Sequence, residues 1–163
     1  MQRSGIILLA DDDRNDASLI SYALRRVGIY NPMRWLGSGD AVIHFLQLDA
    51  IHEDRDIRQM PLLLLLDWNM PGKDTLTVLK WIRAQPKYLN LLVVVLTGSQ
   101  DPVQKRLAYQ AGANWYIVKS ARFTDLTILI QNVRTFWSLT ADCETPLERD
   151  EAISSICDVA GGA

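Results

Sequence analysis

The sequence predicts an α/β fold: a doubly wound, parallel five-stranded sheet in (βα)5 order, covered by helices on both faces as a three-layer sandwich. One observation is that short apolar runs alternate with longer amphipathic segments along the chain. A second is that the runs Leu62–Leu66 and Leu91–Leu96 contain no polar residue, which is typical of strands buried on both faces of a parallel sheet. Alternating strands and helices favour parallel pairing with right-handed crossovers.

The expected strands and helices follow each other without any other internal repeat. The five strands are expected at Ile6–Ala10, Met33–Leu36, Leu62–Leu66, Leu91–Leu96 and Trp115–Val118. The first helix carries the stripe Ile20, Ala23, Leu24 and Val27, and Gly28 follows as a stop signal. Further helices are expected at Asp40–Leu48, at Thr75–Ala84, and from the N-cap Asp101 to Gly112. The stripe of a fifth helix, which starts near Arg122, is Leu126, Leu129, Ile130, Val133 and Trp137.

Composition restricts the class of protein. The chain has 163 residues, of which 48% are hydrophobic, so one domain with a full core is expected over residues 1–140, followed by a tail, residues 141–163. With 17 basic and 19 acidic residues there is no strong basic field, so we expect no DNA binding. The apolar runs are too short for a signal peptide or a membrane span, and a cytoplasmic protein is expected. Cys143 and Cys157 lack metal-site spacing and are expected to be free thiols.

Polar residues with related chemistry end four of the five strands. The first strand ends in the acidic run 11–13, the third in Asp67, the fourth in Thr97 and the fifth in Lys119. In this fold these strand ends converge on one edge of the sheet. Crowded carboxylates repel each other unless a cation intervenes, and Mg²⁺ suits such a set of oxygen ligands. Asp67 could then act as a carboxylate nucleophile toward phosphorus, with Lys119 and Thr97 stabilising the transferred group.

Each residue alone also has a structural interpretation. An aspartate after a buried strand is usually a turn residue or a helix cap, and Thr97 and Lys119 could be a cap and a solvated loop residue. Asp13 and Asp16 fit helix N-terminal charges better than metal ligands. The joint placement of the other residues at successive strand ends favours a functional site.

The chain resembles the response-regulator receiver family from about Ile6 to Leu139. The segments that carry this resemblance are 67–71 (Asp-Trp-Asn-Met-Pro), the acidic loop in 8–16, the fourth strand end 94–97, and 111–119. The resemblance implies a flavodoxin-like receiver fold. It also implies a phosphorelay role, in which a histidine kinase phosphorylates the chain and the chain signals through protein contacts without turning over a metabolite. Residues 14–16, 50–60 and 135–137 resemble the single-domain regulators that partner cyanobacterial and bacterial phytochromes.

The same resemblance implies roles for individual residues. It implies that Asp67 is the phosphoacceptor and that Lys119 is the cation that contacts the phosphoryl group. The implied ligands of Mg²⁺ (or Mn²⁺) are Asp12 directly, Asp11 through water and Asn69 through its backbone carbonyl. Thr97 is implied to be the switch hydroxyl, and Tyr116 the switch aromatic that turns inward when Thr97 moves. Two positions depart from the family pattern. Ser120 replaces a proline that follows a cis peptide, and Thr75 replaces a glycine.

Three other functions compete with this interpretation. A pseudo-receiver that only binds proteins is favoured by Ser120. A phosphatase with an aspartyl-phosphate intermediate would need an acid where Asn69 stands, and dinucleotide binding would need a glycine-rich loop after the first strand.

The expected partners are a sensor histidine kinase, an unidentified downstream protein and a second copy of this chain. Dimerisation is expected through Phe136 and the tail, where a short helix near Arg149–Val159 is expected.

Overall fold

The computed structural model describes residues 5–51, 60–119, 131, 134 and 135. Its elements are β1 (Ile6–Ala10), α1 (Arg14–Arg26), β2 (Met33–Leu36), α2 (Gly39–Ile51), β3 (Pro61–Asp67), α3 (Thr75–Ala84), the short 3-10 helix η2 (Pro86–Tyr88), β4 (Leu92–Thr97), α4 (Pro102–Gln110) and β5 (Trp115–Val118). All five predicted strands and the first four predicted helices are confirmed. The body of the predicted fifth helix, the tail and both cysteines lie outside the described residues.

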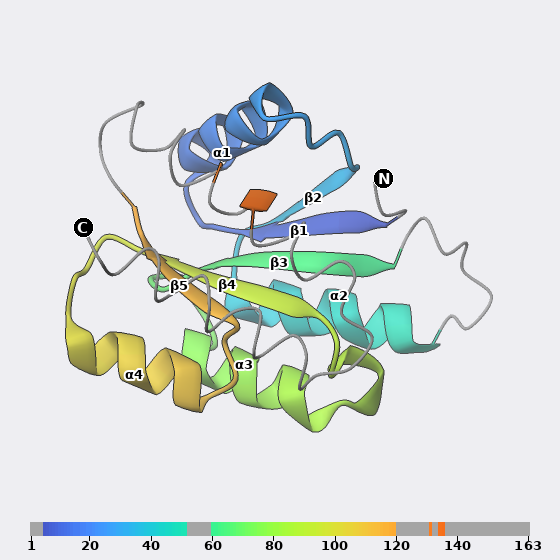
Figure 1. The fold of residues 1–163 in the computed structure, drawn as a ribbon. Coiled ribbons are helices and arrows are strands. Elements are labelled where there is room, and N and C mark those ends of the chain that lie inside the picture. The colour runs from blue at the N-terminus through green and yellow to red at the C-terminus, as the bar shows by residue number, and fades with distance from the viewer. Residues whose placement is uncertain (1–4, 52–59, 120–130, 132–133, 136–163) are drawn as a thin grey trace.

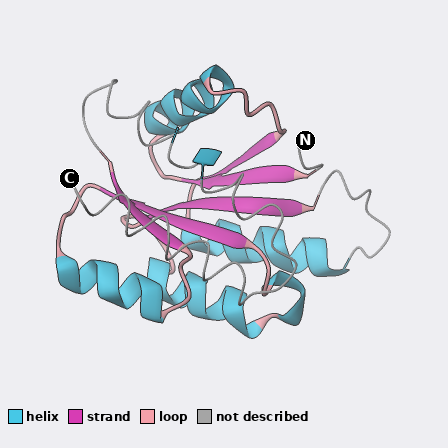
Figure 2. Cartoon of the chain, in the orientation of Figure 1, coloured by secondary structure: helices cyan, strands magenta, loops and turns pink. Residues whose placement is uncertain are grey.

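The strands form one parallel sheet in the order β2-β1-β3-β4-β5. Helix α1 covers one face, and α2, α3 and α4 lie side by side on the other (Figure 1 and Figure 2). This arrangement confirms the doubly wound parallel fold that the alternation of strands and helices predicts. It also brings the carboxyl ends of all five strands to one edge of the sheet.

Two hydrophobic clusters, one on each face of the sheet, make up the described core. One joins α1 to side chains such as Leu63 and Val94, and the other joins α2, α3 and α4 to side chains such as Leu64 and Val95. Leu63–Leu66 are 0% exposed. Successive side chains of a strand point to opposite faces, so a central strand covered on both faces needs an unbroken apolar run.

Aspartates begin three of the helices. Asp13, Asp74 and Asp101 are the N-caps of α1, α3 and α4, and each accepts a hydrogen bond from a backbone N–H of the first turn. Helix α1 ends at Arg26, just before Gly28, whose φ of 87° is the left-handed conformation that favours glycine. Helix α2 extends to Ile51, three residues beyond the predicted end, because no glycine or proline stops it after Leu48.

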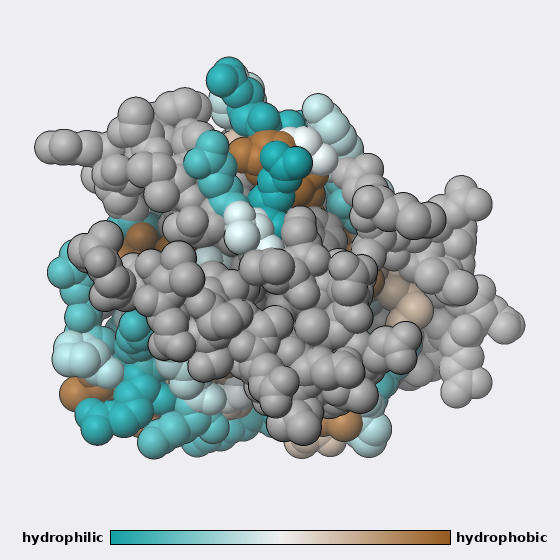
Figure 3. All heavy atoms as spheres, in the orientation of Figure 1, coloured by the Kyte–Doolittle hydropathy of each residue, from teal (hydrophilic) through white to brown (hydrophobic). Residues whose placement is uncertain are grey.

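Hydrophilic residues cover part of the face drawn in Figure 3. In Figure 3 the hydrophilic atoms gather at the lower left, over α4 as placed in Figure 1. No helix in the described part of the chain is long and apolar enough to cross a bilayer.

Candidate functional site

The register of the sheet aligns the ends of its central strands. Ala10 of β1 pairs with Leu66 of β3, Asp67 pairs with Leu96 of β4, and Thr97 pairs with Val118 of β5. The residue that follows each of these positions is therefore carried to the same edge. The strands thus deliver Asp11, Asp67, Thr97 and Lys119 to one small region, as the sequence predicts.

Three carboxylates gather there. Each of Asp11, Asp12 and Asp67 has a carboxylate oxygen within 4.8 Å of the other two. Asp11 is 1% exposed and Asp67 is 7% exposed, whereas Asp12 is exposed. Both oxygens of Asp11 are already engaged, since Oδ1 accepts from the backbone N–H of Asp13 at 2.9 Å and Oδ2 accepts from Lys119 at 2.8 Å. Asp12 is therefore the carboxylate that is open to a ligand from solvent.

The Lys119 ammonium lies among these acids. Its Nζ is 2.8 Å from Asp11 Oδ2, 3.1 Å from Asp67 Oδ1 and 3.4 Å from Asp16 Oδ2. Burial alone would lower the pKa of Lys119, but the hydrogen bond to Asp11 and the charge of Asp67 outweigh it and raise the pKa to about 12. Lys119 is therefore a permanent cation at neutral pH.

Asp67 has the opposite balance. Burial, together with the charges of Asp11 and Asp12, raises the pKa of Asp67 above its ordinary value, although Lys119 acts to lower it. A carboxylate in this position is held among like charges with one cation in contact. A further cation at the cluster would relieve the repulsion that remains.

Hydrogen bonds fix the backbone around Asp67. The backbone N–H of Trp68 donates to the carbonyl of Leu96 at 2.8 Å. The hydroxyl of Thr75, which is 2% exposed, lies 3.0 Å from the carbonyl oxygens of both Asp67 and Trp68. Thr75, which the sequence comparison with the family marks as a departure, thus ties the start of α3 to the end of β3. Asn69 is exposed in the turn that follows.

The loop from β3 to α3 is also held by α2. The Asp40 carboxylate accepts from the backbone N–H of Lys73 at 3.0 Å and from Lys73 Nζ at 2.9 Å. Gly72 has a φ of 79°, and a Cβ there would collide with the Asp40 carboxylate. Only glycine combines this backbone conformation with such a close approach.

Thr97 and Tyr116 are linked through α4. The Thr97 hydroxyl donates to Gln104 Oε1 at 2.8 Å, and the Tyr116 hydroxyl donates to the same oxygen at 2.6 Å. Thr97 is 0% exposed and Tyr116 is 6% exposed. The two hydroxyls are thus joined by a common acceptor. The turn of Tyr116 on movement of Thr97, which the resemblance implies, stays a prediction.

Three residues of this region are not predicted by the sequence analysis. Asp16 contacts Lys119 in addition to its expected place in the first turn of α1. The Trp35 indole N–H donates to the Asp11 carbonyl at 2.8 Å, and Gln104 bridges Thr97 and Tyr116. Each contact depends on how a helix or an edge strand is placed against the sheet, and no local sequence pattern signals that. Ser120, the other departure from the family pattern, lies outside the described residues.

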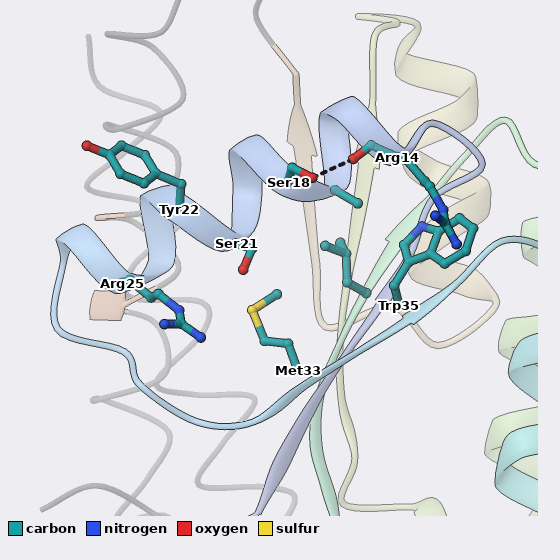
Figure 4. Close-up of a pocket in the computed structure, with 9 residues that line it drawn as sticks. Arg14, Ser18, Ser21, Tyr22, Arg25, Met33 and Trp35 are labelled. Carbon is teal, nitrogen blue, oxygen red and sulfur yellow. Dashed lines mark hydrogen bonds between the residues drawn. The ribbon is translucent and has the colours of Figure 1, made fainter.

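A separate cavity of about 590 Å³ lies between α1 and β2. Figure 4 shows Arg14 beside the Trp35 ring and Arg25 near Met33 at the opposite end. The Arg14 guanidinium carbon is 4.7 Å from the centre of that ring, within the range of a cation–π contact. None of the predicted site residues lines this cavity.

Known proteins are similar to this chain in both sequence and fold. Residues 7–131 match the model of the response regulator receiver domain family. The chain is 34% identical over 132 residues to the "Probable methanogenesis regulatory protein FilR2" of Methanothrix harundinacea, with 81% of this chain and 83% of that protein covered. It is 33% identical over 132 residues to response regulator Rcp1 of Synechocystis, with 81% and 88% covered.

Solved structures of response regulators have a similar fold. The Mn²⁺-bound form of Rcp1 superposes with a TM-score of 0.69 at 33% identity, covering 81% of this chain and 93% of that one. The phosphorylated cyanobacterial phytochrome response regulator RcpA superposes with a TM-score of 0.73 at 28% identity, covering 86% and 98%. The family model, these relatives and the acidic cluster at the strand ends agree, and the chain belongs to the response regulator receiver domain family.

Proposed function

We propose that Asp67 accepts a phosphoryl group from a histidine kinase and that the phosphorylated chain signals through contacts with a partner protein. As a receiver-domain response regulator, the chain is a signalling protein and not a conventional enzyme. The observation that carries the assignment to Asp67 is its place: a carboxylate at a strand end, 3.1 Å from Lys119 Nζ and clustered with Asp11 and Asp12.

The chain's own groups suit this transfer. An oxygen of Asp67 would form the bond to phosphorus as the bond between phosphorus and the kinase histidine breaks. Lys119 would neutralise charge on the phosphoryl oxygens, since it is a permanent cation beside Asp67. Thr97 ends the neighbouring strand and would donate its hydroxyl to another phosphoryl oxygen. Thr75 keeps the backbone of Asp67 in place during the reaction.

The donor set fits a hard divalent cation, Mg²⁺ or Mn²⁺, because it consists of carboxylate oxygens. Asp12 and Asp67 would be direct ligands. Asp11 would act through water, since Lys119 and the Asp13 backbone N–H already occupy its oxygens. The Asn69 carbonyl, two residues after Asp67, would complete the protein ligands. When bound, the ion lowers the repulsion between the acids and neutralises charge on the transferred group.

The histidine kinase partner is proposed to be a phytochrome-type sensor. The support is the likeness to Rcp1 and to RcpA, whose structure is described as that of a cyanobacterial phytochrome response regulator. Homodimerisation through the late fifth helix and the tail, residues 141–163, and a cytoplasmic location stay predictions from the sequence. Size-exclusion chromatography with light scattering tests the dimer, and a monomer at tens of micromolar would contradict it.

Phosphorylation with acetyl phosphate and Mg²⁺, followed by mass spectrometry of peptides, tests the acceptor. We expect a phosphoryl group on Asp67 in the natural chain and none in Asp67→Asn. Asp74→Asn is the matched control, because Asp74 is an exposed N-cap outside the acidic cluster. Equal phosphorylation of Asp67→Asn would overturn the assignment. A natural chain that takes up no phosphoryl group, from acetyl phosphate or from a kinase, would be the pseudo-receiver instead.

A further inference from the structure

Gln104 occupies a position that the family resemblance does not assign. It lies half-buried in the first turn of α4, and its Oε1 accepts hydrogen bonds from both Thr97 and Tyr116. These two hydroxyls come from β4 and β5. One side chain of α4 therefore joins Thr97, at the end of β4, to Tyr116 in β5.

Counting hydrogens shows what this bridge requires. A threonine hydroxyl has one hydrogen to donate, and in the structure Thr97 donates it to Gln104 at 2.8 Å. The Thr97 oxygen also accepts from the backbone N–H of Ser99 at 3.1 Å, which orients the hydroxyl. Thr97 therefore cannot donate to a phosphoryl oxygen and to Gln104 at the same time.

Tyr116 is placed differently. Its hydroxyl is 2.6 Å from Gln104 Oε1 and 3.3 Å from the carbonyl oxygen of Ser99, so a second acceptor lies close by. Loss of Gln104 would leave Tyr116 with that carbonyl. The other hydrogen bond of Thr97, with the Ser99 N–H, uses the hydroxyl oxygen as acceptor, so it is Gln104 that engages the Thr97 hydrogen.

We propose that Gln104 is a positioning residue that competes with the phosphoryl group for the Thr97 hydroxyl and so sets how readily the site adopts its phosphorylated arrangement. This inference rests on the proposed function, in which Asp67 is the acceptor. Phosphorylation would transfer the hydrogen bond of Thr97 from Gln104 to the phosphoryl oxygen, leaving Gln104 bonded to Tyr116 alone. Because Gln104 belongs to α4, this exchange changes how the first turn of α4 is tied to the sheet.

Titration with beryllofluoride in the presence of Mg²⁺ tests the competition, since beryllofluoride mimics an aspartyl phosphate. Gln104→Met keeps the length of the side chain and removes the acceptor, and Gln104→Ala serves if the methionine variant does not fold. A neutral hydrogen bond contributes enough to shift an equilibrium by about 2- to 10-fold. We therefore expect beryllofluoride to bind Gln104→Met at about 2- to 10-fold lower concentration than the natural chain.

Two further variants separate positioning from a general effect on the helix. Gln104→Glu keeps acceptor oxygens, so it should bind beryllofluoride no more tightly than the natural chain does. Gln110→Met makes the same substitution at an exposed position at the end of α4, and it should behave like the natural chain. In the absence of beryllofluoride, the ring NMR signals of Tyr116 should shift in Gln104→Met and stay near their natural positions in Gln110→Met.

The possible results are distinct. Unchanged or weaker binding by Gln104→Met, equal tightening in Gln110→Met, or tightening in Gln104→Glu would each overturn the competition. Unmoved Tyr116 signals in Gln104→Met would overturn the bridge itself. If neither the natural chain nor Asp67→Asn binds beryllofluoride, the proposed function fails, and the role of Gln104 fails with it.

Discussion

Replacing Lys119 with methionine tests how the acidic cluster is balanced. The substitution keeps most of the side-chain volume and removes the charge that contacts Asp11 at 2.8 Å and Asp67 at 3.1 Å. At an effective dielectric constant of about 20, each pair represents about 5 to 6 kcal/mol of gross attraction. Much of this offsets the cost of removing the charges from water. The net loss on breaking a buried pair from one side is about 3 to 5 kcal/mol.

We therefore expect Lys119→Met, without divalent ions, to lower the free energy of unfolding by about 3 to 5 kcal/mol. A domain of this size usually has about 5 to 15 kcal/mol of stability, so the variant should still fold. Addition of Mg²⁺ should restore more stability to the variant than to the natural chain, because the ion replaces the missing positive charge and no longer has Lys119 beside it.

Urea unfolding followed by circular dichroism, with EDTA or with Mg²⁺, provides the measurement. Lys80→Met is the matched control, because Lys80 lies on the exposed face of α3. It should change stability little in either buffer. Two results would refute the reasoning: a loss in Lys119→Met no larger than in Lys80→Met, or an equal gain from Mg²⁺ in the variant and the natural chain.

Three further predictions concern Asp12, Thr75 and Asp74. Asp12→Ala should weaken Mg²⁺ binding at least about tenfold by calorimetry, whereas Asp13→Asn should not, and equal affinities would exclude Asp12 as a ligand. Thr75→Val should cost about 1 to 3 kcal/mol in urea unfolding, and Thr75→Ser, which keeps the hydroxyl, should recover most of it; a harmless Thr75→Val would show that the hydroxyl contributes little. Asp74→Ala should cost about 1 kcal/mol at pH 7. The hydrogen bonds from Thr77 lower the pKa of Asp74 below its ordinary 3.8, so this stabilisation is present above that value and lost as the pH falls further. The cost of Asp74→Ala should therefore shrink in unfolding experiments near pH 3, and an equal cost at both pH values would contradict the assignment.

The fold and the composition of the site could be predicted because both depend on periodic features of the chain. Unbroken apolar runs such as Leu62–Leu66 need burial on both faces, which implies a covered parallel sheet. In a parallel sheet the residues that follow the strands meet at one edge. Asp67 and Lys119 are 52 positions apart by their numbers, yet the register brings them to 3.1 Å. The meeting of the strand ends follows from the sheet, whereas the 3.1 Å contact also needs the long Lys119 side chain, since β4 lies between β3 and β5.

The connections between the site and the helices could not be predicted in the same way. Gln104 and Asp16 lie on helices, and whether they reach Thr97 and Lys119 depends on how far each helix is rotated and which rotamers its side chains adopt. Thr75 illustrates the same limit, because as sequence it is only a departure from the family's glycine. In the structure its hydroxyl bonds the backbone of Asp67 and Trp68. Threonine in place of glycine at position 75 thus restricts the backbone and also adds a hydrogen bond.

These contacts divide the work of the acidic cluster between two kinds of residue. Asp11 has both oxygens occupied, by the Asp13 N–H and by Lys119, and the Trp35 indole N–H holds its carbonyl. It is therefore rigid and poorly available to a ligand. Asp12, the next residue, is exposed and can bind an ion directly. Two adjacent aspartates thus have different roles because the chain leaves the sheet after Ala10 and turns toward α1: Asp11 is still buried at the sheet edge and contacts Lys119, whereas Asp12 faces the solvent from which the ion comes.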